Sequence, residues 1–115
     1  MLLNAGLFDL STECQTSLWK QIYEKKACTI MFIKPGCVRC KPYYSEIQPD
    51  WIIISCASPI DTELFKSFQN FKAPIYCISE TDKERFKKEY DFNQLPFFIQ
   101  VDNHLHVTNA GAQPY

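Results

Sequence analysis

The stretch KPGCVRCKP, residues 34–42, places two cysteines two residues apart among three basic side chains. A Cys-x-x-Cys pair fits a redox couple, a structural disulfide or half of a metal site, so the surrounding sequence has to decide between them. Residues 28–33, CTIMFI, form a continuous apolar run that predicts a strand buried on both faces. The residues from Val38 onward predict a helix. Cys37 is therefore expected at a helix N-terminus, shortly after a buried strand.

The size and composition of the chain indicate one compact domain. Its 115 residues suffice for one hydrophobic core, and we expect a single domain over residues 1–115. The net charge of −1 gives no electrostatic argument for binding nucleic acid. No apolar run reaches the roughly 18 residues of a membrane span, and the N-terminal MLLNAGLF lacks the pattern of an intact secretory signal. We therefore expect neither a nucleic-acid partner nor a membrane span.

Strand and helix patterns alternate along the chain. A capping box at Thr12 predicts a first helix that ends near Lys26, and two later helices are predicted to begin at the N-cap Asp61 and at a capping box on Thr81. The apolar face of the helix from Asp61 is expected to consist of Leu64, Phe65, Phe68 and Phe71. The predicted strands lie at residues 28–33, 51–56, 73–79, 95–101 and 104–108. The last two strands read as an antiparallel hairpin at the sheet edge. The alternation predicts an α/β fold with a mostly parallel sheet between helix layers.

The position of Cys37 makes it the candidate nucleophile. A helix N-terminus presents unpaired N–H groups and the positive end of the helix dipole, which favour the thiolate over the thiol. Lys34, Arg39 and Lys41 add positive charge nearby. Cys40, one turn later, is the candidate resolving thiol, which attacks a mixed disulfide on Cys37 and releases the reduced substrate. Such a dithiol carries its own electrons, so we expect no organic cofactor.

A buried strand, a Cys-x-x-Cys-Lys that opens a helix and a later Leu-Pro leading into an edge hairpin resemble the thioredoxin fold. The resemblance implies that Pro96 is cis and faces the disulfide, and that the backbone of Leu95 pairs with an extended substrate chain. Between Cys40 and Pro96 the sequence predicts one strand-helix unit more than a plain thioredoxin carries. That insertion is similar to the TlpA and ResA type of extracytoplasmic thiol-disulfide oxidoreductase.

The fold implied over residues 12–111 is a central mixed β-sheet flanked by helices, with the extra strand-helix unit before the cis-proline and without a C-terminal helix. The implied activity is disulfide exchange with protein substrates and an upstream redox partner through Cys37 and Cys40. The implied location is extracytoplasmic, such as the periplasm, with tethering through a removed N-terminal segment, and a cytoplasmic location is the alternative. The residues expected to contact substrate are Gly36, Val38, Arg39, Leu95 and Pro96.

Several positions depart from the thioredoxin pattern. Pro35 and Gly36 precede the first cysteine, where that family usually has tryptophan, and Met31 stands where thioredoxins bury a carboxylate as proton acceptor. Pro42 is expected to kink or delay the helix because it removes a backbone N–H. Both thiols remain. Arg39 and the missing carboxylate favour a couple more oxidising than thioredoxin.

Two alternatives remain open at this point. Cys37 and Cys40 could bind zinc together with His104 and His106, which are expected on one side of a strand, but their separation far exceeds zinc-finger spacing, so we expect no metal site. A redox-inert binding module with a static disulfide and a partner surface around Pro96 is the second alternative. Reactivity with thiols distinguishes it from an oxidoreductase.

Four further cysteines occupy positions 14, 28, 56 and 77. The apolar runs around Cys28, Cys56 and Cys77 and the helical pattern at Cys14 predict small, buried thiols. Cys56 and Cys77 belong to two predicted strands, and neighbouring strands would bring them within range of a disulfide.

Overall fold

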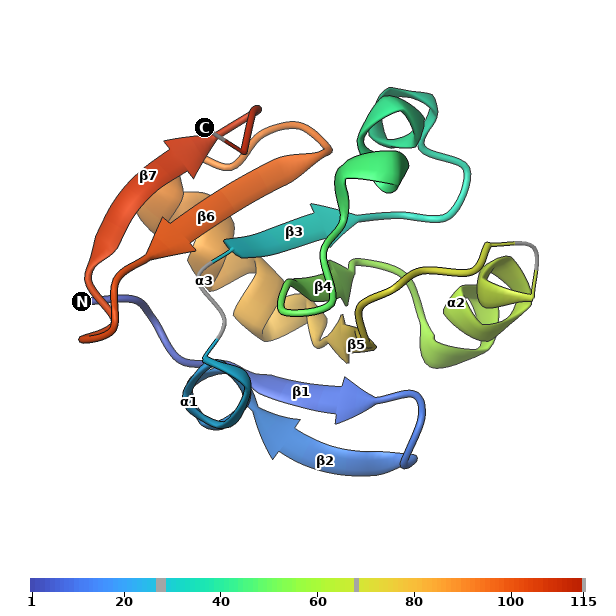
Figure 1. Cartoon of the computed structure of the whole chain (residues 1–115), viewed down its shortest axis with the longest axis horizontal. Coiled ribbons are helices and arrows are strands. Elements are labelled where there is room, and N and C mark those ends of the chain that lie inside the picture. Colours follow the sequence, from blue (N-terminus) through green and yellow to red (C-terminus); the bar gives the residue numbers. More distant parts are fainter. Residues whose placement is uncertain (27–28, 68, 115) are drawn as a thin grey trace.

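The computed structural model describes residues 1–26, 29–67 and 69–114 and is built around one seven-stranded sheet of order β2-β1-β5-β4-β3-β6-β7 (Figure 1). The strands are β1 (Gly6–Asp9), β2 (Cys14–Ser17), β3 (Thr29–Ile33), β4 (Ile52–Ser55), β5 (Ile75–Ile78), β6 (Phe97–Val101) and β7 (Val107–Gly111). The helices are α1 (Leu18–Lys25), the 3-10 helix η1 (Val38–Glu46), α2 (Pro59–Lys66) and α3 (Glu80–Tyr90).

The sheet is mixed, and only its centre is parallel. β3 pairs with β4 and β4 with β5 in parallel, through crossovers that contain η1 and α2. β6 lies antiparallel to β3, and β7 lies antiparallel to β6. The mixed sheet that the resemblance implied is therefore confirmed. The mostly parallel sheet predicted from the alternation of strands and helices is wrong, because β1 and β2 add an antiparallel pair beside β5. The two strand-helix units predicted between Cys40 and Pro96, one more than a plain thioredoxin carries, are present as β4–α2 and β5–α3.

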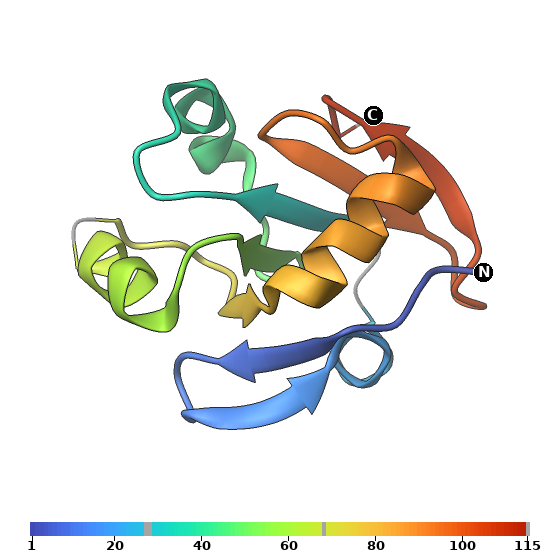
Figure 2. The ribbon, with the colours of Figure 1, turned by 180° about the vertical axis from the view of Figure 1, so that it is seen from behind.

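Two hydrophobic clusters cover the two faces of the sheet. Consecutive residues of β3 alternate between them, with Phe32 in the first cluster and Met31 in the second, as the two-residue period of a strand requires. α1 and α3 contribute Leu18 and Phe86 to the first cluster, and Figure 2 shows α3 lying across that face. η1 contributes Cys40 to the second cluster. All five residues of β3 are buried, because both faces of this strand are covered.

The segment before α1 differs from the prediction. Residues 12–17 were expected to begin a helix, but Glu13 turns the chain with φ 56° and β2 pairs antiparallel with β1. α1 begins only at Leu18, where Ser17 Oγ accepts a hydrogen bond from the Lys20 N–H at 3.3 Å. The capping-box pattern at Thr12 misled because pairing with β1 satisfies the backbone of this segment instead.

The N-caps of α2 and α3 are serines, which were not the predicted N-cap residues. Ser58 Oγ accepts a hydrogen bond from the Asp61 N–H, and Ser79 Oγ accepts one from the Asp82 N–H, each at 3.2 Å. Asp61 and Thr81 lie inside the first turns and are not the caps. The choice of cap was wrong at both helices because serine, aspartate and threonine compete as N-caps, and local sequence does not rank them.

Replacing Ser79 with alanine is expected to lower the free energy of unfolding by about 1 kcal/mol, since the first turn of α3 loses its side-chain acceptor. Thr81→Ala is the matched control. It is expected to change the free energy by less than about 0.5 kcal/mol, because Thr81 is exposed and alanine favours a helix. Urea denaturation measures both values. A larger loss of unfolding free energy for Thr81→Ala than for Ser79→Ala would indicate that Thr81 is the N-cap after all.

The predicted edge hairpin is confirmed in β6 and β7, but its second strand begins at Val107 and not at residue 104 as predicted. Asp102 Oδ1 accepts the N–H groups of His104 and His106, at 2.8 and 2.9 Å, and so closes a turn over residues 102–106. The two histidines therefore lie in the turn and not on a strand. Among the described residues, no helix is long and apolar enough to cross a bilayer.

Candidate functional site

Cys37 and Cys40 form a disulfide at the point where the chain leaves β3 and enters η1. Figure 1 shows the loop that leads out of β3 into this helix. Gly36 adopts φ 82°, a conformation that residues with a Cβ rarely take. The Cys37 N–H donates to the Lys34 carbonyl at 3.1 Å, which closes the turn. Cys37 is thereby the N-cap residue of η1, as the sequence predicted, and lies at the end of the helix where N–H groups are unpaired.

The helix that follows Cys37 is a 3-10 helix with Pro42 inside it. The Cys40 N–H donates to the Cys37 carbonyl three residues earlier, at 3.3 Å, which is the 3-10 pattern. A proline at this place cannot donate in an α-helix and clashes with the carbonyl four residues before it. The interruption expected at Pro42 is therefore seen as a change of helix type, and the predicted helix is present.

The two sulfur-bearing residues differ in exposure. Cys40 has no exposed surface and lies in the second cluster with Met31, Ile33 and Phe98. Cys37 is half-buried and packs against the same cluster from its outer side. Of the two, Cys37 is the one that a second protein can reach. The fully buried Met31 supplies an apolar thioether in this cluster, and no group that could accept a proton.

The Leu95–Pro96 segment adjoins the disulfide. Its peptide bond is cis, as the resemblance implied, and Leu95 packs against the cluster that contains Cys40. Arg39 Nη1 donates to Gln94 Oε1 at 3.4 Å across a sequence separation of 55 residues. The fold thus brings the Cys-x-x-Cys turn to the start of β6. Sequence reasoning missed Gln94, whose only signal is its place directly before the Leu-Pro pair.

The remaining predicted site residues differ in exposure. Gly36, Val38 and Arg39 are all exposed, and Val38 keeps 75% of its surface accessible. Pro96 is buried and directly precedes β6. His104 and His106 lie beyond the other end of β6, so the fold does not bring them to the cysteines. The four residues therefore do not come together as ligands of one zinc ion, which excludes this zinc site.

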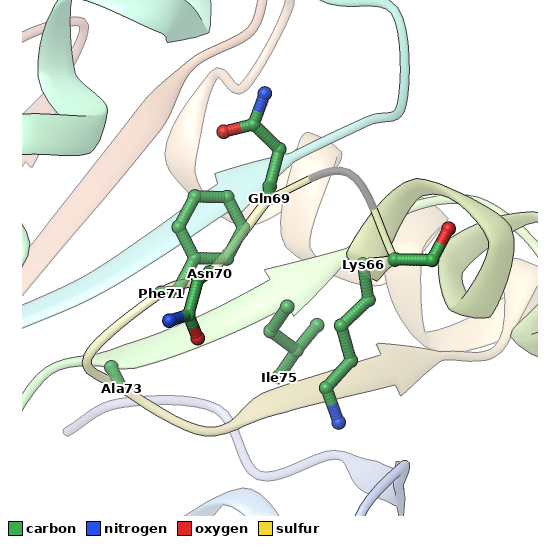
Figure 3. Close-up of a pocket in the computed structure, with 7 residues that line it drawn as sticks. Lys66, Gln69, Asn70, Phe71, Ala73 and Ile75 are labelled. Atoms are coloured by element: carbon green, nitrogen blue, oxygen red, sulfur yellow. The ribbon is translucent and has the colours of Figure 1, made fainter.

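Two hollows flank the helices on this side of the sheet. One of about 410 Å³ separates the turn before Cys37 from α2, and its lining residues are Lys34, Pro35, Ala57, Asp61, Leu64 and Phe65. The other, of about 350 Å³, lies between the end of α2 and the start of β5 (Figure 3). Figure 3 shows Phe71, Ile75 and Lys66 around it. Only the first hollow includes residues of the Cys-x-x-Cys turn.

The α2 segment is shorter than its sequence pattern suggested. The helix ends at Lys66, so Phe71, expected on its apolar face, lies beyond it and contacts Tyr44 of η1 edge to face at 4.8 Å. Phe68 lies outside the described residues. Leu64, expected to be buried on the same face, is 62% exposed and lines the first hollow.

The other cysteines take three different environments. Cys77 is buried as predicted, Cys56 is half-buried, and Cys14 is exposed on β2, which corrects the prediction of a buried helical thiol. Cys28 lies outside the described residues. Cys56 and Cys77 are both free although β4 and β5 are neighbours. The hypothesis of a bridge between them is wrong, because Cys77 pairs with Ser55 and the next residue, Cys56, therefore faces the opposite side of the sheet.

Burial raises the pKa of the Cys56 thiol to about 11, against a smaller lowering by nearby Lys83. Alkylation of Cys56 in the reduced native protein is therefore expected to be slow at pH 8 and to accelerate about tenfold per pH unit up to about pH 11, because the thiolate is the reactive form. The exposed Cys14 is the control. Iodoacetamide labelling with peptide mass spectrometry measures both rates, and equal rates at pH 8 would contradict the burial of Cys56.

Comparison with known proteins supports the fold. No protein-family model and no curated protein sequence matches this chain. A structure from Chlorobium tepidum, described as the thiol:disulfide interchange protein DsbE, aligns with a TM-score of 0.73 and 12% identity, over 96% of this chain and 81% of that one. The exposed lipoprotein thioredoxin Etrx1 of Streptococcus pneumoniae aligns at 0.69 and 12%, over 96% and 90%.

A secreted disulfide oxidoreductase of Mycobacterium tuberculosis, homologous to Escherichia coli DsbE, aligns at 0.68 and 14%, over 95% of this chain and 83% of that one. These neighbours are thioredoxin-fold thiol-disulfide oxidoreductases, so the resemblance stated from the sequence and the thioredoxin fold are confirmed. At such identity the likeness establishes the fold alone.

Proposed function

We propose that the protein is a thiol-disulfide oxidoreductase that exchanges disulfides with protein substrates through Cys37 and Cys40. The observation that carries this proposal is the disulfide itself, with one half-buried and one fully buried sulfur-bearing residue, next to the Leu95 segment. A structural disulfide does not need an accessible sulfur beside a surface that can receive an extended chain.

In the oxidising direction, a substrate thiolate attacks Cys37 Sγ. The bond to Cys40 breaks, Cys40 leaves as a thiolate that takes up a proton, and a mixed disulfide forms. A second substrate thiolate then attacks the substrate sulfur of that mixed disulfide and releases the Cys37 thiolate. Two electrons pass from the substrate dithiol to the protein, and the reverse sequence reduces a substrate disulfide.

The substrate chain lies along Leu95, where an extended backbone pairs with the segment before β6, and it passes Gly36 and Val38 on the opposite side of Cys37. This placement is supported by the exposure of Gly36 and Val38 and by the shared packing of Leu95 and Cys37. We also propose an extracytoplasmic location, supported by one neighbour described as an exposed lipoprotein and one described as secreted.

The surroundings of the two thiols favour an oxidising couple. Three basic residues near Cys37 stabilise its thiolate and hence the reduced form, and no Asp or Glu is buried among the residues described, so none lies beneath Cys40 as a proton acceptor. A potential above thioredoxin's value of about −270 mV is expected.

A redox titration in glutathione or dithiothreitol buffers, read by alkylation and peptide mass spectrometry for each cysteine, tests the proposal. Cys37 and Cys40 are expected to titrate together and reversibly, while the other four cysteines stay reduced across the same range. Resistance of the pair to reduction would overturn the proposal and favour the redox-inert binding module.

A further inference from the structure

The turn that contains Cys37 carries three cations that form no salt bridge among the residues described. Residues 34–42 contain Lys34, Arg39 and Lys41 and no carboxylate, although the whole chain has a net charge of −1. All three cations are exposed, and none forms a salt bridge with any residue that the structure describes. On α3, by contrast, acids one turn earlier pair with three cations: Glu80 with Lys83, Asp82 with Arg85 and Glu84 with Lys87.

Arg39 is held over the path that a substrate chain would take. Its bond to Gln94 places the guanidinium between the Cys-x-x-Cys turn and the Leu95 segment. One such bond leaves most of the guanidinium N–H donors for a ligand, and their planar arrangement matches a carboxylate. An acidic side chain close to the reacting cysteine of a substrate would reach this group.

Exposed apolar side chains lie on both η1 and α2. Val38 is 75% exposed and Leu64 is 62% exposed, and Leu64 lines the hollow of about 410 Å³ with Pro35 and Phe65. Asp61 also lines this hollow and offsets Lys34 there, so the unbalanced charge lies at Arg39 and Lys41. Covering large apolar side chains removes them from water and stabilises a complex.

We propose that the partner of Cys37 is a polypeptide segment with carboxylates within a few residues of its reactive cysteine and a large apolar side chain that enters this hollow. The carboxylates contact Arg39 and Lys41, and the apolar side chain contacts Leu64. The inference rests on the proposed function and names its substrate class. Charge complementarity of this kind acts mainly on the rate of association, so its effect declines with salt.

Three cysteine-pair peptides, identical except for Glu, Gln or Lys beside the cysteines, test the charge requirement. The Glu peptide is expected to reduce the Cys37–Cys40 disulfide about tenfold faster than the Gln peptide at low salt, and the difference is expected to shrink at high salt. In the double variant Arg39→Gln, Lys41→Gln the ratio of the two rates falls to within about twofold. The ratio cancels any change in the reactivity of the disulfide itself.

The double variant Lys25→Gln, Lys88→Gln is the matched control, since it removes two exposed cations from α1 and α3. It is expected to keep the tenfold ratio. Two further peptides, with Phe or Ser at the position expected to enter the hollow, test the apolar contact. Leu64→Ser is expected to slow the reduction of the disulfide by the Phe peptide and to leave the rate with the Ser peptide unchanged.

Equal rates for the Glu and Gln peptides, or an equal loss of their ratio in the control variant, would overturn the acidic-segment inference while leaving the oxidoreductase proposal intact. If Leu64→Ser changed the reaction rates of the Phe and Ser peptides equally, the proposed apolar contact with Leu64 would be wrong. Failure of all peptides to react, together with a disulfide that resists dithiothreitol, would overturn the proposed function itself.

Discussion

Replacing Cys37 with serine is expected to lower the rate of disulfide exchange by at least about a thousandfold, because it removes the accessible sulfur that reacts with substrate. Cys40→Ser has a different expected outcome. Its Cys37 still attacks a substrate disulfide, but no second thiol resolves the product, so a stable mixed disulfide accumulates. Reduction of a disulfide-bonded polypeptide measures the rate, and mass spectrometry under non-reducing conditions detects the trapped species.

The variants Cys14→Ser and Cys77→Ser are the controls, because Cys14 lies on β2 at the sheet edge and Cys77 faces α2 from β5. Both are expected to keep the exchange rate of the unaltered protein. Trapping by Cys37→Ser with inactivity of Cys40→Ser would reverse the two roles. Full activity of both variants would show that the chemistry lies elsewhere in the chain.

Replacing Phe32 with alanine is expected to lower the free energy of unfolding by about 3–5 kcal/mol. Phe32 has no exposed surface, and its ring centroid lies 5.0 Å from that of Phe92, 5.8 Å from that of Phe86 and 6.4 Å from that of Phe97. The loss combines the transfer of the ring to water with the cavity left among these partners. It is large beside the roughly 5–15 kcal/mol by which domains of this size are stable.

Denaturation in urea measures this loss with the disulfide intact and again after reduction. Phe32 faces the cluster opposite to Cys40, so the loss is expected to be the same in both states. Tyr23→Ala, at a position 85% exposed, is the control and is expected to change the free energy by less than about 0.5 kcal/mol. A loss below about 1 kcal/mol for Phe32→Ala would contradict the packing of the first cluster.

Local sequence predicted secondary structure best for the strands that are buried on both faces of the sheet. The apolar runs that became β3, β4 and β5 were found because such strands need no polar face, and composition alone reveals them. β1 and β2 were missed. Their sequences GLFD and CQTS contain neither an apolar run nor a regular alternation, and their strand conformation depends on pairing with each other and with β5.

The order of residues along the chain was enough to place Cys37 at a strand-to-helix turn and Cys40 one turn later, because turn and helix signals act over a few residues. It was also enough to point to Pro96 as the residue that begins the last hairpin. Sequence did not reveal the bond from Arg39 to Gln94, or that Cys56 and Cys77 face opposite sides of the sheet. Those relations depend on strand order and register, which long-range packing sets and neighbouring residues do not encode.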